Sequence, residues 1–264
     1  MNFKSIKKPN VPTPRQIKRY GWIPSLPDKR DLVFSALNTT GLPKLVDLRS
    51  KCPAIYNQGN LGSCTANALA GIFEFEMMRQ NLPSIFLPSR LFIYYNERVI
   101  EGTVDTDSGA ELRDGMKTLA KQGVCPETMW PYIISKFTKK PTATCYATAL
   151  KNLAVKYMRV RQDLNQLKGT LAMGIPVVFG FTVYDSFESP TVAKTGIVPM
   201  PGPDEGVLGG HAVVLVGYDD EKKMFIVRNS WGTKWGLKGY FYMPYAYVTD
   251  TSLCSDFWMI QSVS

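Results

Sequence analysis

A cysteine at the junction of a glycine-rich turn and a long apolar stretch is the residue best placed for nucleophilic chemistry. The turn QGNLGS covers residues 58–63, and residues 64–80 are apolar enough to form a helix. Cys64 would lie in the first helical turn, where free backbone N–H groups and the helix dipole lower the pKa of a thiol. Ser63 is the expected N-cap, and Gln58 is placed to direct its amide toward the same point. A buried structural cysteine is the alternative, because free cysteines are often buried.

Two later motifs supply the partners that a cysteine nucleophile needs. His211 is the only histidine, and it stands in the otherwise apolar run GGHAVVLVGY. A buried imidazole costs free energy unless it is paired or used, and it exchanges a proton near neutral pH. Asn229 follows in the run RNSWGTKWG, where the indoles of Trp231 and Trp235 would shield a hydrogen bond between Asn229 and His211 from water. A structural histidine and a turn asparagine are the alternatives.

The motifs QGNLGSC, GHAV and NSWGTKWG, in this order, resemble those of the papain-like cysteine peptidases. The resemblance implies a cysteine endopeptidase that forms an acyl-thioester on Cys64. His211 would act as the base and then protonate the leaving amine, while Asn229 would fix the imidazole. Gln58 and the Cys64 backbone N–H would form the oxyanion hole. This chemistry needs neither a metal ion nor a cofactor.

The same resemblance assigns substrate binding to Ser108, Gly109, Gly210 and Trp231. Ser108 and Gly109 match the segment whose backbone bonds an extended substrate, and the other two stand in the GHAV and NSWG motifs. The alternative for Ser108 is an N-cap followed by a flexible glycine.

The order of elements predicts an α+β fold, because helical patterns precede strand patterns. Helices are expected over residues 64–80, after Ser89, between Gly109 and Gly123, and over residues 163–173; strands are expected over residues 176–184, 211–218, 224–228 and 239–243. With the resemblance, this becomes a papain-like two-lobe fold. A helical lobe (43–150) carries the nucleophile, an antiparallel β lobe (151–264) carries His211 and Asn229, and the cleft lies between them.

Residues 1–42, the arm, precede the region of strong resemblance, which covers about residues 43–264. The arm is interrupted by prolines, and Tyr20, Trp22, Ile23 and Leu26 need an apolar surface to cover them. Its YGW and PDKRD patterns are similar to those of the short-prosegment members found in bacteria and large viruses. The arm is therefore expected to lie across the cleft as an intramolecular inhibitor of a zymogen.

Composition limits the possible partners and locations. The 264 residues contain no apolar run long enough for a membrane span, and the first twenty lack the core of a secretory signal. This predicts a location inside the cell or in a particle such as a virion. Of the net charge of +9, the surplus lies mainly before Asp28, the first acidic residue. These N-terminal basic residues are typical of a solvated tail rather than of a nucleic-acid site. The expected partners are peptide or protein substrates, and the chain is expected to be a monomer.

Several points stay open at this level. Cys52, Cys125, Cys145 and Cys254 allow three pairings, and reduced thiols are expected without a secretory signal. Two positions depart from the family pattern, Leu61 where a cysteine is usual and Thr65 where an aromatic residue is usual.

Other functions remain alternatives. One is an inactive relative kept as a binding or scaffold module, and another is a related cysteine acyl-transfer enzyme. Filled chemical positions argue against the first, and Asn229 in place of an acid argues against the second. A carboxydipeptidase would need additional histidines.

Overall fold

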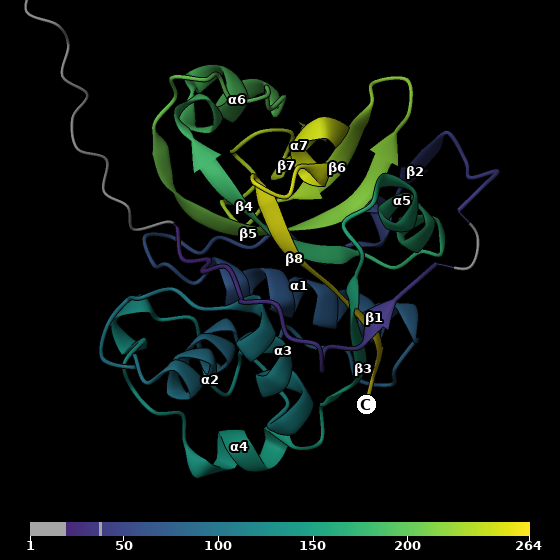
Figure 1. Ribbon diagram of the computed structural model, residues 1–264. Helices are drawn as coiled ribbons and strands as arrows, with labels where there is room; N and C mark the ends of the chain where they lie inside the picture. Colours follow the sequence, from purple (N-terminus) through teal and green to yellow (C-terminus); the bar gives the residue numbers. More distant parts are fainter. Residues whose placement is uncertain (1–19, 37–38) are drawn as a thin grey trace, which may run out of the picture.

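The three longest helices lie in the first half of the chain and the long strands in the second half (Figure 1), as the sequence predicts. The structure is a computed structural model that describes residues 20–36 and 39–264. The helices are α1 (Cys64–Arg79), α2 (Arg90–Glu101), α3 (Leu112–Lys121), α4 (Ala143–Ala149), α5 (Leu164–Ala172), α6 (Pro190–Thr195) and α7 (Tyr245–Thr249). The strands are β1 (Val33–Phe34), β2 (Leu45–Asp47), β3 (Ala154–Val160), β4 (Val177–Tyr184), β5 (Val207–Asp219), β6 (Met224–Arg228), β7 (Tyr240–Pro244) and β8 (Cys254–Val263).

Helix α1 runs through the middle of the molecule because nearly all its faces are apolar. Leu69 and Phe73 are fully buried, as are most of their neighbours along the helix. In Figure 1, α1 lies between helices α2 and α3 on one side and the sheet on the other. The predicted burial on every side is confirmed, and it fixes the start of α1, with Cys64, at the boundary between the two parts.

One sheet orders the second half of the chain. Its strands run β1-β3-β8-β4-β5-β6-β7, with β2 added beside β5. Every pairing is antiparallel except that of β1 with β3, which is parallel. Strand β4 pairs with β5 so that Phe181 faces His211 and Thr182 faces Gly210. The GHAV motif therefore lies on a central strand, where flanking strands fix its backbone.

The expected helices are present, but two of their caps differ from the prediction. Ser89 caps α2 by accepting from the Phe92 N–H at 3.2 Å, as expected. Ser63 precedes α1 but makes no side-chain cap bond, because its hydroxyl bonds Tyr132 instead at 2.5 Å. Ser108 is not an N-cap, since α3 begins after Glu111.

In the described part of the chain, four strands have no counterpart among the four expected: β1 in the arm, β2, β3, whose residues are mostly exposed or half-buried, and β8. Strand β1 is only two residues long and exists because it pairs with β3, at Val33 with Arg159 and Phe34 with Val160. A pairing partner so far away in the chain is invisible to local pattern.

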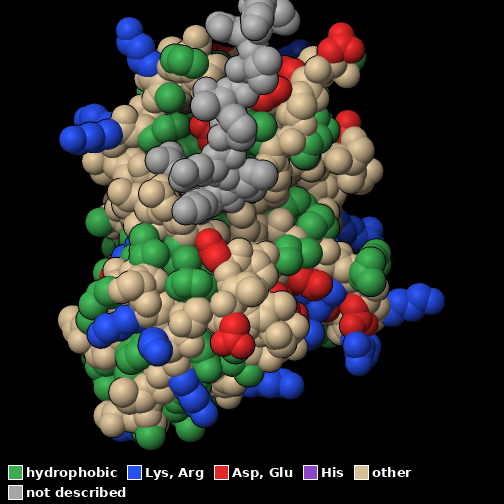
Figure 2. Space-filling model, turned by 90° about the vertical axis from the view of Figure 1, so that its left-hand side faces the viewer, with side chains coloured by type: hydrophobic (Ala, Val, Ile, Leu, Met, Phe, Trp, Pro, Cys, Tyr) green, Lys and Arg blue, Asp and Glu red, His purple; other side chains and the backbone are tan. Residues whose placement is uncertain are grey.

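The architecture is α+β with a helical lobe and a β lobe. In the described ranges, 20–36 and 39–264, no helix is long and apolar enough to cross a membrane. On the face drawn in Figure 2, basic and acidic side chains are interspersed among apolar ones rather than gathered by sign.

Candidate active site

The structure places Cys64 at the first position of α1, fully buried. Its sulfur lies within hydrogen-bonding reach of the backbone of Ala212, on β5, and of Gly21, in the arm. Burial raises the pKa of the thiol to about 12 and outweighs these backbone bonds, which lower it. The predicted lowering of the thiol pKa is thus wrong for this state of the chain, because the arm excludes water from the sulfur.

His211 lies on β5, directly before Ala212, and is also fully buried. Its Nε2 atom is 2.8 Å from Oδ1 of Asn229, whereas its Nδ1 atom has no hydrogen-bond partner. Burial lowers the pKa of the imidazole to about 4, and the bond to Asn229 opposes this shift. In this covered arrangement the thiol and the imidazole are therefore both neutral near pH 7.

Aromatic rings enclose the bond between His211 and Asn229. The ring of Trp231 stacks on the imidazole, with 4.9 Å between centroids and an interplanar angle of 29°. Trp235 meets Trp231 edge-on at 5.1 Å, and Phe187 meets it at 5.6 Å. A dry, apolar surrounding strengthens a hydrogen bond, so these rings hold the imidazole in one orientation.

Gln58 is buried and ties the turn before Cys64 to the segment after Asn229. Its Oε1 atom accepts from Ser230 Oγ at 2.6 Å, and its backbone N–H donates to the Ser230 carbonyl at 2.9 Å. Its Nε2 atom donates to the Leu61 carbonyl at 3.0 Å. The structure therefore brings together the QGNLGSC, GHAV and NSWG motifs, whose residues come from both lobes.

The described part of the arm begins at Tyr20, runs between the lobes and contacts both (Figure 1). We call residues 20–25 the cleft segment. The Trp22 N–H donates to the Gly210 carbonyl at 3.0 Å, on the β side. On the helical side, the Ala110 N–H donates to the Gly21 carbonyl at 2.7 Å and the Ile23 N–H to the Ala110 carbonyl at 3.0 Å, in a parallel bridge.

Glycines allow the cleft segment to lie this close. A Cβ on Gly109, which has a φ of +77°, would lie 2.2 Å from the Gly21 carbonyl oxygen, and one on Gly210 would lie 2.3 Å from the Trp22 carbonyl oxygen. Either side chain would push the segment away. Gly109 and Gly210 thus leave the channel in which an extended chain fits.

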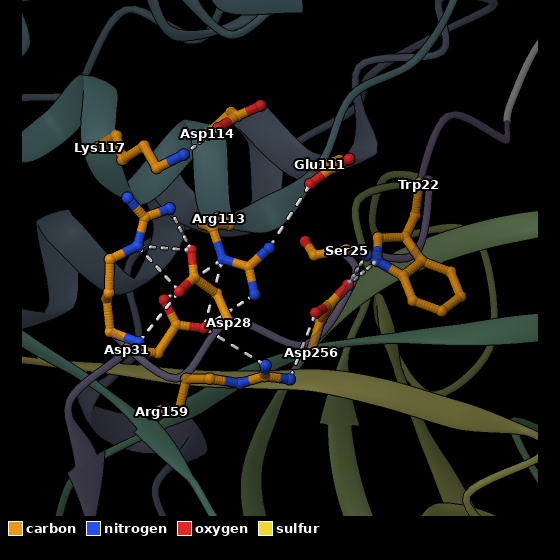
Figure 3. Close-up of polar contacts among 11 residues, drawn as sticks. Trp22, Ser25, Asp28, Asp31, Glu111, Arg113, Asp114, Lys117, Arg159 and Asp256 are labelled. Atoms are coloured by element: carbon orange, nitrogen blue, oxygen red, sulfur yellow. Dashed lines mark hydrogen bonds and ion pairs between the residues drawn. The ribbon is translucent and has the colours of Figure 1, made fainter.

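The indole of Trp22 is buried against the strands of the β lobe, and we call the place it occupies the Trp22 pocket (Figure 3). A Cβ on Gly180 of β4 would lie 1.9 Å from the indole, so the ring rests directly on the strand backbone. At the pocket floor, the Trp22 Nε1–H donates to Asp256 Oδ2 at 3.1 Å, and the Ser25 N–H donates to the same oxygen at 2.7 Å. Burial raises the pKa of Asp256, whereas the hydrogen bonds from Ser25 and Trp22 lower it and so favour the charged carboxylate.

Tyr20 begins the described part of the arm beside the imidazole. Its ring centroid lies 6.2 Å from that of His211 and 6.1 Å from that of Trp231. Its hydroxyl donates to the carboxylate of Glu188. The cleft segment therefore runs from the histidine, over the cysteine, into the Trp22 pocket.

Sequence reasoning located most of these residues but missed Ala110, Gly180 and Glu188. On the helical side the backbone bonds to the arm come from Ala110, whereas the hydroxyl of Ser108 donates to Thr103 at 2.9 Å. The only signal for Ala110 was its place directly after Ser-Gly.

A helical lobe with a cysteine at a helix start, joined to a β lobe with a His–Asn pair, is the architecture of a thiol peptidase. The chain belongs to the papain family of cysteine proteases, whose family model matches residues 42–255. It is therefore a hydrolase of the cysteine protease type with the papain-like fold.

Relatives support this placement over nearly the whole chain. An uncharacterized peptidase C1-like protein of Acanthamoeba polyphaga mimivirus is 45% identical, over 94% of this chain and 88% of its own. The crystal structure of xylellain, a cysteine protease from Xylella fastidiosa, is 45% identical with a TM-score of 0.90, and the match covers 96% of this chain and 100% of that one. A procathepsin B of Trypanosoma congolense shares the fold at 21% identity and a TM-score of 0.70, over 86% of this chain and 80% of its own.

Proposed function

We propose that the chain hydrolyses internal peptide bonds through an acyl-thioester on Cys64. The thiolate attacks the carbonyl carbon, and His211 donates its proton to the departing amine. The acyl group stays on sulfur until water, deprotonated by His211, attacks it and releases a carboxylate and the free thiol. The observation that carries this proposal is the meeting of Cys64 with the backbone of Ala212, next to a His211 that is bonded to Asn229 at 2.8 Å.

Asn229 and Gln58 are proposed to support this reaction without bond changes of their own. Asn229 accepts from the Nε2–H of His211, which leaves Nδ1 free to exchange a proton with the sulfur. Gln58 and the Cys64 N–H are proposed as the oxyanion hole. In the covered state the Gln58 amide donates to Leu61, and losing such a donor costs about 10²–10³ in rate.

The arm is proposed to inhibit the enzyme by occupying the substrate channel. It seals the thiol, and its backbone takes the bonds of Ala110 and Gly210. Because the arm belongs to the same chain, its local concentration is on the order of mM, so moderate contacts suffice to keep the cleft filled. Two of the structural neighbours are named procathepsins, which supports the proposal that this chain also carries an inhibitory proregion.

An extended peptide is proposed to bind where the cleft segment lies. Gly109 and Gly210 would admit its backbone, Trp231 would border it near the imidazole, and Ser108 would support the loop before α3. The division into an arm (1–42), a helical lobe (43–150) and a β lobe (151–264) is kept as part of this proposal. A monomer and a location inside a cell or a virus particle stay predictions, and the viral relative supports the latter.

Fluorogenic peptides test the proposal directly. The full chain should cleave them at an internal bond at the low rate that the arm leaves, and Cys64→Ser should abolish cleavage, whereas Cys254→Ser, a buried cysteine outside the site, should keep most of it. A Cys64→Ser variant that retains the wild-type rate would reject the mechanism.

A further inference from the structure

Between residues 20 and 36, the arm has two parts that bind different places. The cleft segment, residues 20–25, ends where the Ser25 N–H reaches Asp256. We call residues 31–36 the anchor segment, because it joins the outer edge of the sheet as β1. Residues 26–30 connect the two.

The anchor segment is held by buried charge and by backbone bonds. Asp31 accepts from Arg113 of α3 at 2.8 Å and lies 3.4 Å from Arg159 of β3, so it joins the two lobes (Figure 3). The Arg159 N–H donates to the Leu32 carbonyl at 2.8 Å, and the Ala36 N–H donates to Gln166 at 2.7 Å. Most of these contacts lie away from the cleft, and Arg159 alone also reaches the Trp22 side, where it pairs with Asp256 at 3.4 Å.

The connection between the two parts is an exposed turn. Leu26 is 80% exposed and the Arg30 side chain 89% exposed. The bonds within it are local: Arg30 bonds the carboxylate of Asp28, and the Asp31 N–H donates to the Asp28 carbonyl. A cavity of about 330 Å³ lies between this turn and the strand residues around Arg159, so the turn spans a hollow.

Lys29 and Arg30 are the only basic residues between positions 20 and 43. Exposed turns with few contacts are the preferred sites of proteolytic cleavage, because the local backbone extends into a peptidase without unfolding the domain. The basic pair thus stands in the one exposed turn that separates the cleft segment from the anchor segment.

We propose that the turn at Lys29 and Arg30 is a processing site for a peptidase that cleaves after basic residues. Water adds across the bond after Lys29 or after Arg30, giving a new carboxylate on the cleft side and a new amine on the anchor side. The anchor segment stays on α3 and β3, whereas the cleft segment loses its tether and with it a local concentration on the order of mM. This inference rests on the proposed inhibition by the arm.

Limited digestion of the full chain with trypsin tests this inference. Digestion is stopped with a trypsin inhibitor, the new N-termini are identified by sequencing and intact mass, and cleavage of a fluorogenic peptide is measured against a Cys64→Ser sample treated alike. We expect kcat/KM to rise about tenfold or more, because the tether is lost, in step with chains that begin at Arg30 or Asp31. Chains that begin at Tyr20, cut within the basic tail, should show no rise.

A double variant Lys29→Gln/Arg30→Gln should keep the activity of the undigested chain and lose the increase in kcat/KM after trypsin treatment. The matched control is Lys139→Gln/Lys140→Gln, an exposed basic pair elsewhere, which should behave like wild type.

The inference fails if the turn resists trypsin, if the increase in kcat/KM follows a cut at another site, or if the cut at the turn leaves activity unchanged. In the last case Gly21→Ala separates the two ideas, because its methyl group would lie only 1.7 Å from the Gly62 carbonyl oxygen and displace the cleft segment. A folded Gly21→Ala chain that is faster than wild type leaves the inhibition standing, and one that is no faster removes it too.

Discussion

Gly21 of the arm and Gly62 of the turn before Cys64 touch backbone to backbone. A Cβ built on Gly21 would lie only 1.7 Å from the Gly62 carbonyl oxygen. Real atoms do not approach this closely, and neither partner has a side chain that could move aside. The arm therefore covers the thiol only because position 21 is glycine.

Gly21→Ala should accordingly open the cleft. The methyl group cannot be accommodated beside Gly62, so the cleft segment must move away from Cys64. We expect kcat/KM toward a small fluorogenic peptide to rise about tenfold or more as the tethered segment is displaced. Leu26→Ala, at an exposed position of the arm, is the matched control and should leave the rate unchanged. A Gly21→Ala chain that folds normally and is no faster than wild type would contradict inhibition by the arm.

Trp22 should contribute most of the binding of the cleft segment. Removing a buried indole costs about 3 to 5 kcal/mol, so Trp22→Ala should weaken coverage of the cleft and raise kcat/KM. Trp22→Phe fills much of the pocket but lacks the N–H that bonds Asp256 at 3.1 Å. It should fall between wild type and Trp22→Ala. If Trp22→Phe activates as fully as Trp22→Ala, the bond to Asp256, not the filling of the pocket, holds the arm.

The sequence predicts the fold well wherever local pattern and long-range packing agree. Helix α1 was expected because its residues are apolar on every face, and β6 was expected at its observed bounds, Met224–Arg228. The approach of Cys64 to β5, the strand that carries His211, was expected only through the resemblance, because no local pattern relates two residues on different lobes.

What the sequence could not reveal depends on contacts between distant segments. The path of the arm is set by Gly21, Gly109 and Gly210, and glycines alone do not show what approaches them. The pKa of Cys64 was expected to fall because of its helix position, but it rises because the arm buries it. Strand β1 likewise exists only through its pairing with β3.

Alkylation of Cys64 should report whether the arm is in place. Burial raises the pKa of this thiol to about 12, so almost none of it is thiolate near pH 7. Iodoacetamide should label Cys64 slowly in the wild-type chain and at least about tenfold faster in Gly21→Ala, where water regains access. Peptide mass mapping separates this signal from Cys52, Cys125, Cys145 and Cys254. Equal labelling of Cys64 in both chains would show that the covered thiol is already reactive.

His211 should make the stability of the full chain depend on pH. Its pKa is lowered to about 4 in the folded chain, against about 6.5 when unfolded. Between pH 4 and pH 6.5, His211 is therefore protonated in the unfolded chain but neutral in the folded chain. Keeping His211 neutral therefore stabilises the folded chain fully only above pH 6.5. As the pH falls from 6.5 to 4, the free energy of unfolding decreases by about 3 kcal/mol on account of His211.

Urea unfolding at a series of pH values, compared between wild type and His211→Gln, isolates this contribution. The difference in the free energy of unfolding between the two chains should change between pH 6.5 and pH 4 and stay level above 6.5. A difference that is constant from pH 4 to pH 8 would show that the imidazole titrates normally and is not buried as the structure places it.

Asp31 should stabilise the fold, whereas Asp28, three residues earlier, should not. The side chains of Asp31 and Arg113 are 11% and 8% exposed, so Asp31→Asn leaves a nearly buried guanidinium with only the more distant carboxylate of Glu111, 3.9 Å away, as its ion-pair partner among the described residues. This should lower the free energy of unfolding by about 2 to 4 kcal/mol. Asp28 pairs with Arg30 in the exposed turn, where solvent screens the charges, so Asp28→Asn should leave the free energy of unfolding unchanged. Urea denaturation of both variants with the arm intact measures the difference. If the two substitutions have the same effect, the anchor segment does not hold α3 and β3 together, and the whole arm would leave with the cleft segment.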